Sequence, residues 1–393
     1  MNILYIWDAD YPWDIRVEKI CQTLYKNGHN VHIASRNLQK NIELEEINGL
    51  QIHRLKPRNN DKLNYILSFP LFFSPIWKKF IHTIIEQNDI DLIIVRDLPM
   101  AIAGIWAGNK YNIPVIFDMA EDYLAMLRDI WKFKKFHGLN LVLRNPYLAQ
   151  FVQKYAFKNA DHVLVVVDET IAVITETGGK LENITIVSNT PELTNFETSP
   201  EIENSSDIEE IHNNYSVIYT GGIQMGRGIQ TMLKAIPKII KTIPDFSFVI
   251  VGSGYAKSLL EELAREEGVE AHVKWIGWVD HAMLFDYVRA CKAGIIPHLV
   301  TDHVNTTIPN KIFDYMGCET PVICSDAIPL ERIINEEKCG LVYKSGNPDS
   351  LADAVIKLYQ DSDNYGQNGF NAVKNKYNWP EDEQRLLSVI NKY

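Results

Sequence analysis

The sequence has few cysteines, no long apolar run and no excess of basic residues. Its 393 residues include 39 Lys and Arg against 50 Asp and Glu, which gives a formal net charge of −11. A protein that binds nucleic acid over its surface is normally basic, so the charge argues against that class. The remaining composition is that of a globular protein, and a chain of this length favours two domains.

The cysteine spacing and the short apolar stretches indicate the cellular compartment in which the protein is expected. The five cysteines include no CxxC pair and no cluster with histidine. This spacing argues against structural zinc and against a disulfide framework, and it fits a reducing compartment. The most apolar stretch, residues 66–77, contains two prolines, whereas a membrane-spanning helix needs about 20 apolar residues. We therefore expect a cytoplasmic protein without a targeting segment or a membrane span.

Short apolar runs of strand length alternate with longer amphipathic runs along most of the chain. This alternation is typical of parallel sheets with helices on both faces. The predicted fold class is α/β, with two Rossmann-like, doubly wound domains that face each other across a cleft. The predicted strands are residues 2–7, 31–34, 91–95, 115–117, 162–167, 216–219, 248–251, 272–275, 293–296, 321–324 and 340–342.

An acidic and polar segment at residues 197–214 interrupts the alternation. We interpret it as a linker, because it has no apolar stripe to bury. The predicted domains are therefore residues 1–196 and 215–378. A last helix within residues 379–393 is expected to pack back on the first domain.

Glycines gather at residues 220–228, TGGIQMGRG, between a predicted strand and a helix that begins near Ile229. Gly221 and Gly222 would let the backbone approach a ligand, and a helix N-terminus offers free N–H groups to a phosphate. Arg227 adds a positive charge with fixed geometry. The alternative is an ordinary glycine turn.

A second candidate site lies at residues 306–316, TTIPNKIFDYM. Pro309 suits the first turn of a helix, with Thr306 or Thr307 as its cap. The helix dipole opposes a cation in that turn, so Lys311 there suggests a bound anion. Asp314 lies on roughly the same face. The two could hold a diphosphate and a ribose, or they could form a simple surface ion pair.

Two further strand ends are weaker candidates. Gly252 begins a strand-to-helix turn, GSG. Trp278 follows another predicted strand and could stack on a base, act as a lid or belong to the core.

Carboxylates follow a buried strand of the first half in the segment Asp118-Met119-Ala120-Glu121-Asp122. They could bind sugar hydroxyls or act as a base, or they could simply favour a helix N-terminus. Arg16 lies in the first turn of the first helix, where the dipole also disfavours a cation. Asp8-Ala9-Asp10 has the spacing of a metal motif, but it lies in the first domain, away from the expected phosphates. We predict no metal site.

Together these motifs resemble glycosyltransferase family 4, whose fold is GT-B, over nearly the whole chain. PWDIRVEK at 12–19 with GHNV at 28–31, and VSNTP at 187–191, are similar to segments of the family. The glycine segment resembles the family's G-R-L-x-x-x-K-G loop. PNKIFDYMGCETPVI at 309–323 resembles P-x-K-x-x-E-Y-M-x-x-G-x-P-V-I.

The resemblance implies a nucleotide-sugar donor in the second domain and an acceptor in the first. It also implies retention at the anomeric carbon and no metal or other cofactor. By position, Arg227 and Lys311 would contact the donor diphosphate, and Asp314 would hold the ribose hydroxyls. The predicted donor-binding residues are Gly221, Gly222, Arg227, Gly252, Lys311, Asp314, Trp278 and Thr306, and the predicted catalytic or acceptor contacts are Glu121, Asp118 and Arg16.

Four positions depart from the family pattern. Gly222 replaces an arginine of the loop, and Thr306 replaces the glutamate that contacts the donor sugar. Ala120 lies near a position that is often histidine, and Glu319 replaces a glycine. These departures weaken any prediction of which sugar is transferred.

Residues 63–85 and 127–158 combine lysine or arginine with aromatic residues, although the whole chain is acidic. This mixture suits the anionic inner face of a cell membrane. The alternative is two core helices with solvated faces.

The sequence therefore predicts a retaining glycosyltransferase that needs no metal. Its donor would be a nucleoside-diphosphate sugar, with UDP favoured by the family. Its acceptor would be a glycan or lipid-linked saccharide of surface polysaccharide biosynthesis. Two alternatives stay open: a non-catalytic glycosyltransferase-like scaffold subunit and a nucleotide-sugar epimerase.

Overall fold

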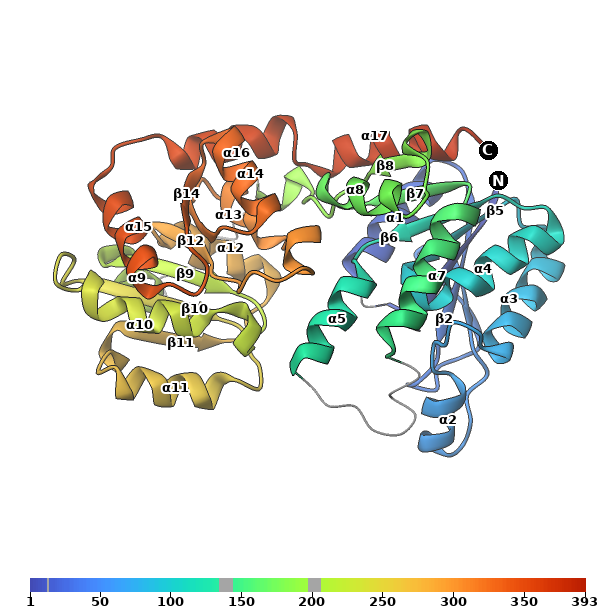
Figure 1. Ribbon diagram of the computed structural model, residues 1–393, viewed down its shortest axis with the longest axis horizontal. Helices are drawn as coiled ribbons and strands as arrows, with labels where there is room; N and C mark the ends of the chain where they lie inside the picture. The colour runs from blue at the N-terminus through green and yellow to red at the C-terminus, as the bar shows by residue number, and fades with distance from the viewer. Residues whose placement is uncertain (13, 134–143, 197–205) are drawn as a thin grey trace. The chain divides into compact units, whose positions relative to one another are not determined.

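A computed structural model describes residues 1–12, 14–133, 144–196 and 206–393, and the chain forms two compact units. The N-terminal unit comprises Met1–Asn189 and Asp382–Tyr393, and the C-terminal unit comprises Thr190–Glu381. The division lies before the predicted boundary at residue 196, and the last residues of the chain return to the N-terminal unit. Each unit is a largely parallel sheet with helices on both faces (Figure 1).

The sheet of the N-terminal unit has the order β3-β4-β2-β1-β5-β6-β7-β8 within the described residues. All pairs are parallel except β3 with β4, an antiparallel hairpin that the sequence did not predict. Chain order reverses direction at β1, which lies between β2 and β5. The strands are β1 (Asn2–Asp10), β2 (Asn30–Arg36), β3 (Leu44–Ile47), β4 (Leu50–Arg54), β5 (Leu92–Arg96), β6 (Val115–Met119), β7 (His162–Val165) and β8 (Ile184–Ile186).

The first helix of this unit shows how local sequence sets an element. Asp14 caps α1, because its carboxylate accepts hydrogen bonds from the backbone N–H of Arg16 and Val17, both at 3.0 Å. The apolar stripe that predicted the helix is buried in the structure. The helices are α1 (Ile15–Lys26), α2 (Asp61–Leu67), α3 (Pro75–Asn88), α4 (Asp97–Tyr111), α5 (Tyr123–Phe133), α7 (Pro146–Asn159), α8 (Glu169–Glu176) and the short η1 (Leu181–Asn183).

The sheet of the C-terminal unit has the order β11-β10-β9-β12-β13-β14 in the part of the chain described. Chain order reverses between β9 and β12. Its core includes Phe246 and Phe248 of β10, packed with β9 and α10. The strands are β9 (Tyr215–Thr220), β10 (Phe246–Val251), β11 (Val273–Gly277), β12 (Ala293–Ile296), β13 (Val322–Ser325) and β14 (Gly340–Tyr343).

The helices of the C-terminal unit lie before the first strand, between successive strands and after the last strand. The final helix, α17 (Trp379–Ile390), begins in this unit and ends in the other. The remaining helices are η2 (Leu193–Phe196), α9 (Ser206–Asn213), η3 (Met225–Arg227), α10 (Ile229–Ile239), α11 (Lys257–Glu266), η4 (Glu270–His272), α12 (His281–Ala290), η5 (Val304–Thr306), α13 (Lys311–Gly317), α14 (Ile328–Glu337), α15 (Pro348–Gln360) and α16 (Tyr365–Asn375).

Two local predictions are wrong. Residues 206–213 of the predicted linker form α9, which packs on α12 and buries Ile211 completely; residues 197–205 lie outside the described part. The helix with Lys311 begins later than predicted: Asn310 is its N-cap residue, and Pro309 and Thr306 precede it. One buried isoleucine was too weak a signal for α9 among so many acidic residues.

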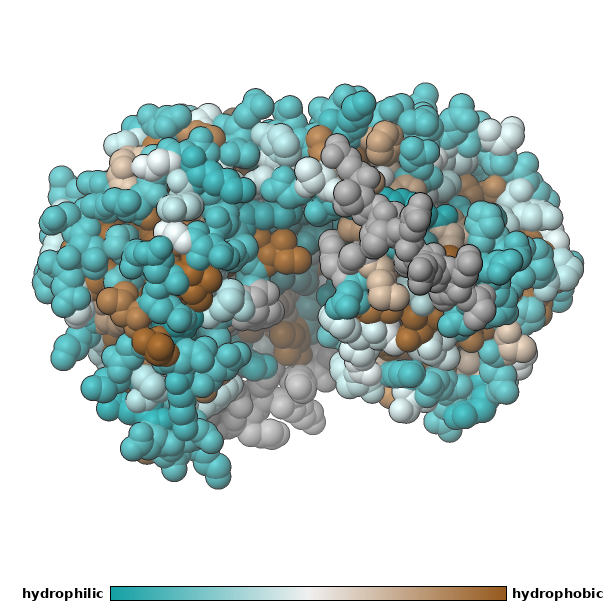
Figure 2. Space-filling view, turned by 180° about the vertical axis from the view of Figure 1, so that it is seen from behind, coloured by the Kyte–Doolittle hydropathy of each residue, from teal (hydrophilic) through white to brown (hydrophobic). Residues whose placement is uncertain are grey.

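The surface seen in Figure 2 is mostly hydrophilic, with hydrophobic residues scattered among polar ones. Within the described ranges, no helix combines the length and hydrophobicity that a bilayer span requires.

Candidate functional site

The carboxyl ends of β9 and β10 are neighbours in the sheet of the C-terminal unit. The strand order reverses on the other side of β9, between β9 and β12, and ligands bind at such a point. Gly221 follows β9 with φ +119°, and Gly252 follows β10 with φ +143°. A Cβ atom on Gly252 would lie 2.0 Å from the carbonyl oxygen of Gly221. The two loops therefore approach so closely that only glycine fits at residue 252.

Lys311, the first residue of α13, reaches back to this glycine loop. Its Nζ donates a hydrogen bond to the carbonyl of Thr220 and lies 3.9 Å from the centre of the Tyr219 ring. A Cβ atom on Gly221 would lie 3.1 Å from the same Nζ. Burial, reinforced by the charge of Arg227, holds the pKa of Lys311 well below its usual value.

Arg227 ends η3, immediately before α10, so the predicted loop-to-helix junction is present. Its Nη1 lies 3.3 Å from Nε2 of His298, which follows β12. Among the described residues, neither Arg227 nor Lys311 forms an ion pair with a carboxylate, although the charge of Asp314 acts to raise the pKa of Lys311. Two basic side chains thus flank the glycine loop, and an anion bound there would favour the charged form of Lys311.

The other predicted donor residues lie at varied positions. The carbonyl of Gly222 accepts a hydrogen bond from Tyr219 at 2.8 Å, so this residue shapes the loop. Asp314 lies one turn after Lys311 on α13. The Thr306 hydroxyl bonds within its own turn, to the carbonyl of His303 at 3.1 Å. Trp278 is 73% exposed after β11, which excludes a place in the core.

In the N-terminal unit, Asp118 and Arg16 form a buried ion pair. Asp118 is fully buried, and its Oδ2 also accepts a hydrogen bond from Tyr5 at 2.7 Å. Burial would raise the pKa of Asp118, but the charge and hydrogen bonds of Arg16 outweigh this and hold it below its usual value. The other bonds of Arg16 go to the carbonyl of Val187 and the side chain of Asn189. Asp118 and Arg16 are thus paired with each other inside the N-terminal unit, and their contact with an acceptor stays a prediction.

Glu121 remains available, because its side chain is exposed at the carboxyl end of β6. Asp97 fixes the backbone there: its Oδ1 accepts hydrogen bonds from the N–H groups of Ala120 at 3.1 Å and Glu121 at 3.3 Å. Arg96 bonds Asp97 at 3.2 Å and Asp14 at 2.8 Å. Burial raises the pKa of Asp97 to about 7, although Arg96 opposes the shift.

Asp8 lies two residues before the end of β1, the strand at which the strand order reverses, and is a further candidate for the site. Burial raises its pKa to about 6, against the opposing charges of Arg96 and Arg36. Its carboxylate has no side-chain partner within the described residues. The sequence signal for this candidate is a polar residue directly after the apolar run of residues 2–7. No cluster of three or more His, Cys, Asp or Glu in the described ranges could hold a metal.

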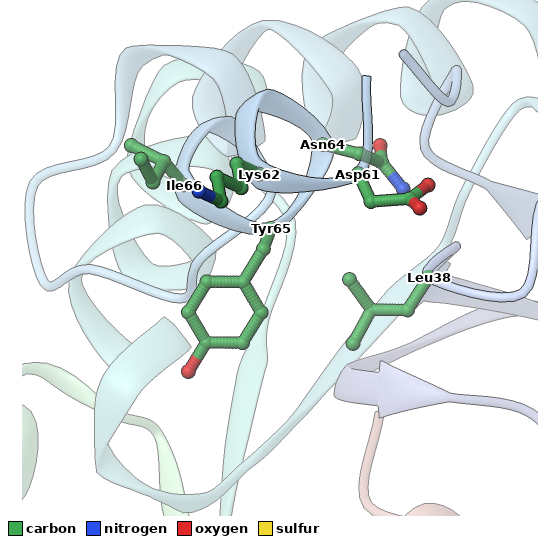
Figure 3. A pocket seen from close by; sticks show the side chains of 6 residues that line it. All are labelled: Leu38, Asp61, Lys62, Asn64, Tyr65 and Ile66. Atoms are coloured by element: carbon green, nitrogen blue, oxygen red, sulfur yellow. The ribbon is translucent and has the colours of Figure 1, made fainter. Parts of the chain in front are cut away.

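A pocket of about 480 Å³ opens beyond the carboxyl end of β2, between Leu38 and α2 (Figure 3). Tyr65 and Ile66 form its exposed apolar wall. The guanidinium of Arg36 stacks on the Tyr65 ring at 4.8 Å. The buried Asn64 anchors α2 to β2, because its amide donates a hydrogen bond to the carbonyl of Asn37 at 2.8 Å.

Family models match both units of the chain. The model described as "Glycosyltransferase Family 4" matches residues 15–192, and that described as "Glycosyl transferases group 1" matches residues 214–361. An uncharacterised glycosyltransferase of Methanocaldococcus jannaschii is 23% identical over 95% of this chain and 93% of its own length. The phosphatidyl-myo-inositol mannosyltransferase of Mycobacterium leprae is 24% identical over 42% of each chain.

Solved structures share the whole fold. Sucrose-phosphate synthase from Thermosynechococcus elongatus aligns with a TM-score of 0.78 at 18% identity, covering 100% of this chain and 98% of its own. Anabaena HepE in complex with UDP-glucose aligns with a TM-score of 0.72 at 16% identity, covering 100% of both chains. The two matched models and the shared fold lead to one conclusion: the chain belongs to glycosyltransferase family 4 and has the GT-B fold.

Proposed function

We propose that the C-terminal unit binds a nucleoside-diphosphate sugar, with UDP as the nucleotide. The observation that carries this proposal is the position of Arg227 and Lys311 beside a glycine loop, where neither forms an ion pair with a carboxylate of the described residues. A diphosphate would offset the burial and the charge of Arg227, which together hold the pKa of Lys311 below its usual value. Asp314 would bind the ribose, and exposed Trp278 would stack on the base. UDP is supported by HepE, which was solved with UDP and UDP-glucose.

The proposed reaction transfers the sugar with retention, as the family resemblance implies. A bond forms between the acceptor oxygen and the anomeric carbon, and the bond from that carbon to the diphosphate breaks. Negative charge develops on the diphosphate as this bond breaks, and the departing diphosphate oxygen accepts the proton that the acceptor hydroxyl loses. Arg227 and Lys311 would stabilise this charge without a metal, because fixed cations aimed at a leaving group lower the barrier.

The N-terminal unit would bind the acceptor, a glycan or lipid-linked saccharide of surface polysaccharide biosynthesis. Glu121 and Asp8 supply exposed or partly exposed carboxylates for sugar hydroxyls at the sheet end. The apolar wall of Tyr65 and Ile66 would pack against a sugar face or a lipid group.

We also propose that this unit contacts an anionic membrane from the cytoplasmic side. Support comes from α3, α4 and the residues before α3. Lys78 of α3 lies 4.6 Å from the centre of the Trp106 ring of α4, and exposed Phe73, before α3, packs beside the same ring at 6.2 Å. In the second basic segment, 127–158, residues 134–143 lie outside the described residues. The test is sedimentation with phosphatidylglycerol vesicles. We expect binding that salt weakens and that Lys78→Ala with Lys79→Ala reduces, whereas equal binding to neutral vesicles contradicts the proposal.

The donor site is tested by titrating UDP, GDP and their sugars without metal, followed by thermal unfolding. Binding to the folded state raises the melting temperature by mass action. Arg227→Ala and Lys311→Ala should abolish most of the shift, while Lys234→Ala, an exposed lysine of α10, should not. If both variants keep the full shift, the diphosphate assignment is wrong. If no nucleotide raises the melting temperature of the wild type, the scaffold function gains support. Conversion of the donor to an isomeric nucleotide sugar in the absence of acceptor would instead indicate an epimerase.

A further inference from the structure

The segment that follows β12 packs directly against the loop that ends in Arg227. The backbone N–H of Leu299 donates a hydrogen bond to the carbonyl of Gly226 at 3.2 Å. A Cβ atom on Gly228 would lie 1.7 Å from the carbonyl oxygen of Pro297. The two segments are therefore in backbone contact on both sides of Arg227.

His298 lies between these backbone contacts and is 2% exposed. Its Nε2 is 3.3 Å from Nη1 of Arg227. Because a guanidinium can only donate, Nε2 must accept and the proton must be on Nδ1. Burial and the charges of Lys311, Arg227 and His303 lower the pKa of His298, which keeps the ring neutral and able to accept near neutral pH.

The backbone of His298 is itself held from the neighbouring strands. The Ser345 hydroxyl, after β14, donates to the carbonyl of His298 at 3.4 Å and accepts from the N–H of Val300 at 2.9 Å. The N–H of Ser345 in turn donates to Asp326, after β13, at 2.9 Å. These hydrogen bonds fix the backbone that carries the His298 imidazole. The Arg227 side chain, in contrast, is exposed.

We propose that His298 is a positioning residue that holds the Arg227 guanidinium in place for the donor diphosphate. This inference rests on the proposed donor site. A free arginine loses rotamer entropy when it clamps an anion, and a preformed hydrogen bond reduces that loss before the ligand arrives. His298 thus acts on the diphosphate through Arg227, and its effect requires Arg227 to be present.

The experiment is a double-mutant cycle read by calorimetric titration with UDP and UMP. The proteins are the wild type, His298→Ala, His298→Gln, Arg227→Ala and the double variant Arg227→Ala with His298→Ala. We expect His298→Ala to weaken UDP binding about tenfold, because a hydrogen bond to a charged group is lost. UMP has no second phosphate, so its affinity should change less than about twofold. His298→Gln keeps an acceptor at a similar reach and should restore most of the affinity.

The decisive comparison is the Arg227→Ala background, where removal of His298 should weaken UDP binding by less than about twofold. If His298 had only a structural role, His298→Ala would weaken the binding of UDP and UMP equally, and the same loss would occur in the Arg227→Ala background. Either result overturns the inference. Thermal unfolding of each variant checks folding, and His298→Gln provides the comparison if the alanine variant unfolds. If wild type binds UDP and His298→Ala binds it equally well, this inference fails alone. If wild type binds no nucleoside diphosphate, the donor site and this inference fail together.

Discussion

Arg16 and Asp118 lie in direct ionic contact inside the N-terminal unit, with Nη2 2.5 Å from Oδ1. The pair joins α1 to β6, and Arg16 extends the connection to the carbonyl of Val187 at 2.7 Å. Both side chains are almost completely buried. Breaking a buried, hydrogen-bonded ion pair costs several kcal/mol, because it leaves a charge buried without its partner. The pair therefore holds α1 and the carboxyl end of β6 in a fixed position.

Asp118→Asn should therefore destabilise the protein strongly. The substitution leaves the Arg16 charge buried without its counter-charge, which costs about 3–5 kcal/mol. Urea unfolding followed by circular dichroism measures the loss. A variant that unfolds at the wild-type midpoint would show that the pair contributes little.

Glu121→Gln is the matched comparison in the same segment. Glu121 is exposed, so its stability change should stay within about 0.5 kcal/mol. If Glu121 contacts the acceptor, transfer slows in this variant although the fold is intact. The two variants thus separate loss of folding from loss of function at neighbouring carboxylates.

The alternation of strand and helix patterns was sufficient to predict the doubly wound units, because each buried parallel strand is a nearly continuous apolar run. The Lys311 and Arg227 positions were also inferred from local sequence. Their meeting with Thr220 and His298 depends on loops that converge where strand order reverses, a property of topology that no local pattern contains.

The pairing of Arg16 with Asp118 could not be inferred for the same reason. A charged residue after a strand looks identical in sequence whether it faces solvent or a partner 102 residues away. The α2 pocket and the β3–β4 hairpin were missed because their segments have weak periodicity and exposed apolar residues.

Glu319→Gly should stabilise the C-terminal unit. Glu319 follows α13 with φ +56°, a left-handed conformation that costs a residue with a Cβ atom about 1–2 kcal/mol. Glycine adopts it without that strain, which also explains the family's glycine at this position. The greater conformational entropy of glycine in the unfolded chain offsets part of this relief. We therefore expect a net gain of about 1 kcal/mol in the free energy of unfolding.

Glu319→Ala provides the control for this prediction. Alanine keeps the Cβ atom and the strain, so it should not reproduce the gain. If alanine stabilises as much as glycine, the side chain of Glu319 rather than its backbone conformation is the source.

Buried histidine should make the N-terminal unit sensitive to acid. Burial and the nearby charge of Lys392 lower the pKa of His162 to about 4. Its unfolded pKa is near 6.5, so between pH 6.5 and 4 the unfolded chain binds more protons and stability falls as the pH falls. Asp8 and Asp97 have raised pKa values and act in the opposite direction. The contribution of His162 must therefore be measured as a difference between variant and wild type.

His162→Gln removes this titration. The free energy of unfolding of the variant minus that of the wild type should be about 2 kcal/mol larger at pH 5 than at pH 7.5. The reason is that pH 5 lies about 1.5 units below the unfolded pKa of histidine. Urea midpoints at the two pH values give the comparison, with His212→Gln, an exposed site, as control. A difference that does not change with pH would show that His162 titrates normally in the folded protein.

Gly252→Ala should disrupt the donor loop while Gly268→Ala does not. Both glycines have positive φ, +143° and +69°, so both substitutions introduce backbone strain. Only at Gly252 does the new Cβ meet backbone, 2.0 Å from the Gly221 oxygen, whereas nothing lies within 4 Å at Gly268. The Gly221 loop must then move away from Lys311, and we expect UDP binding to weaken at least about tenfold in Gly252→Ala. Gly268→Ala should lose stability but keep its affinity. Equal affinities in the two variants would mean that the close approach of the two loops is not what shapes the diphosphate site.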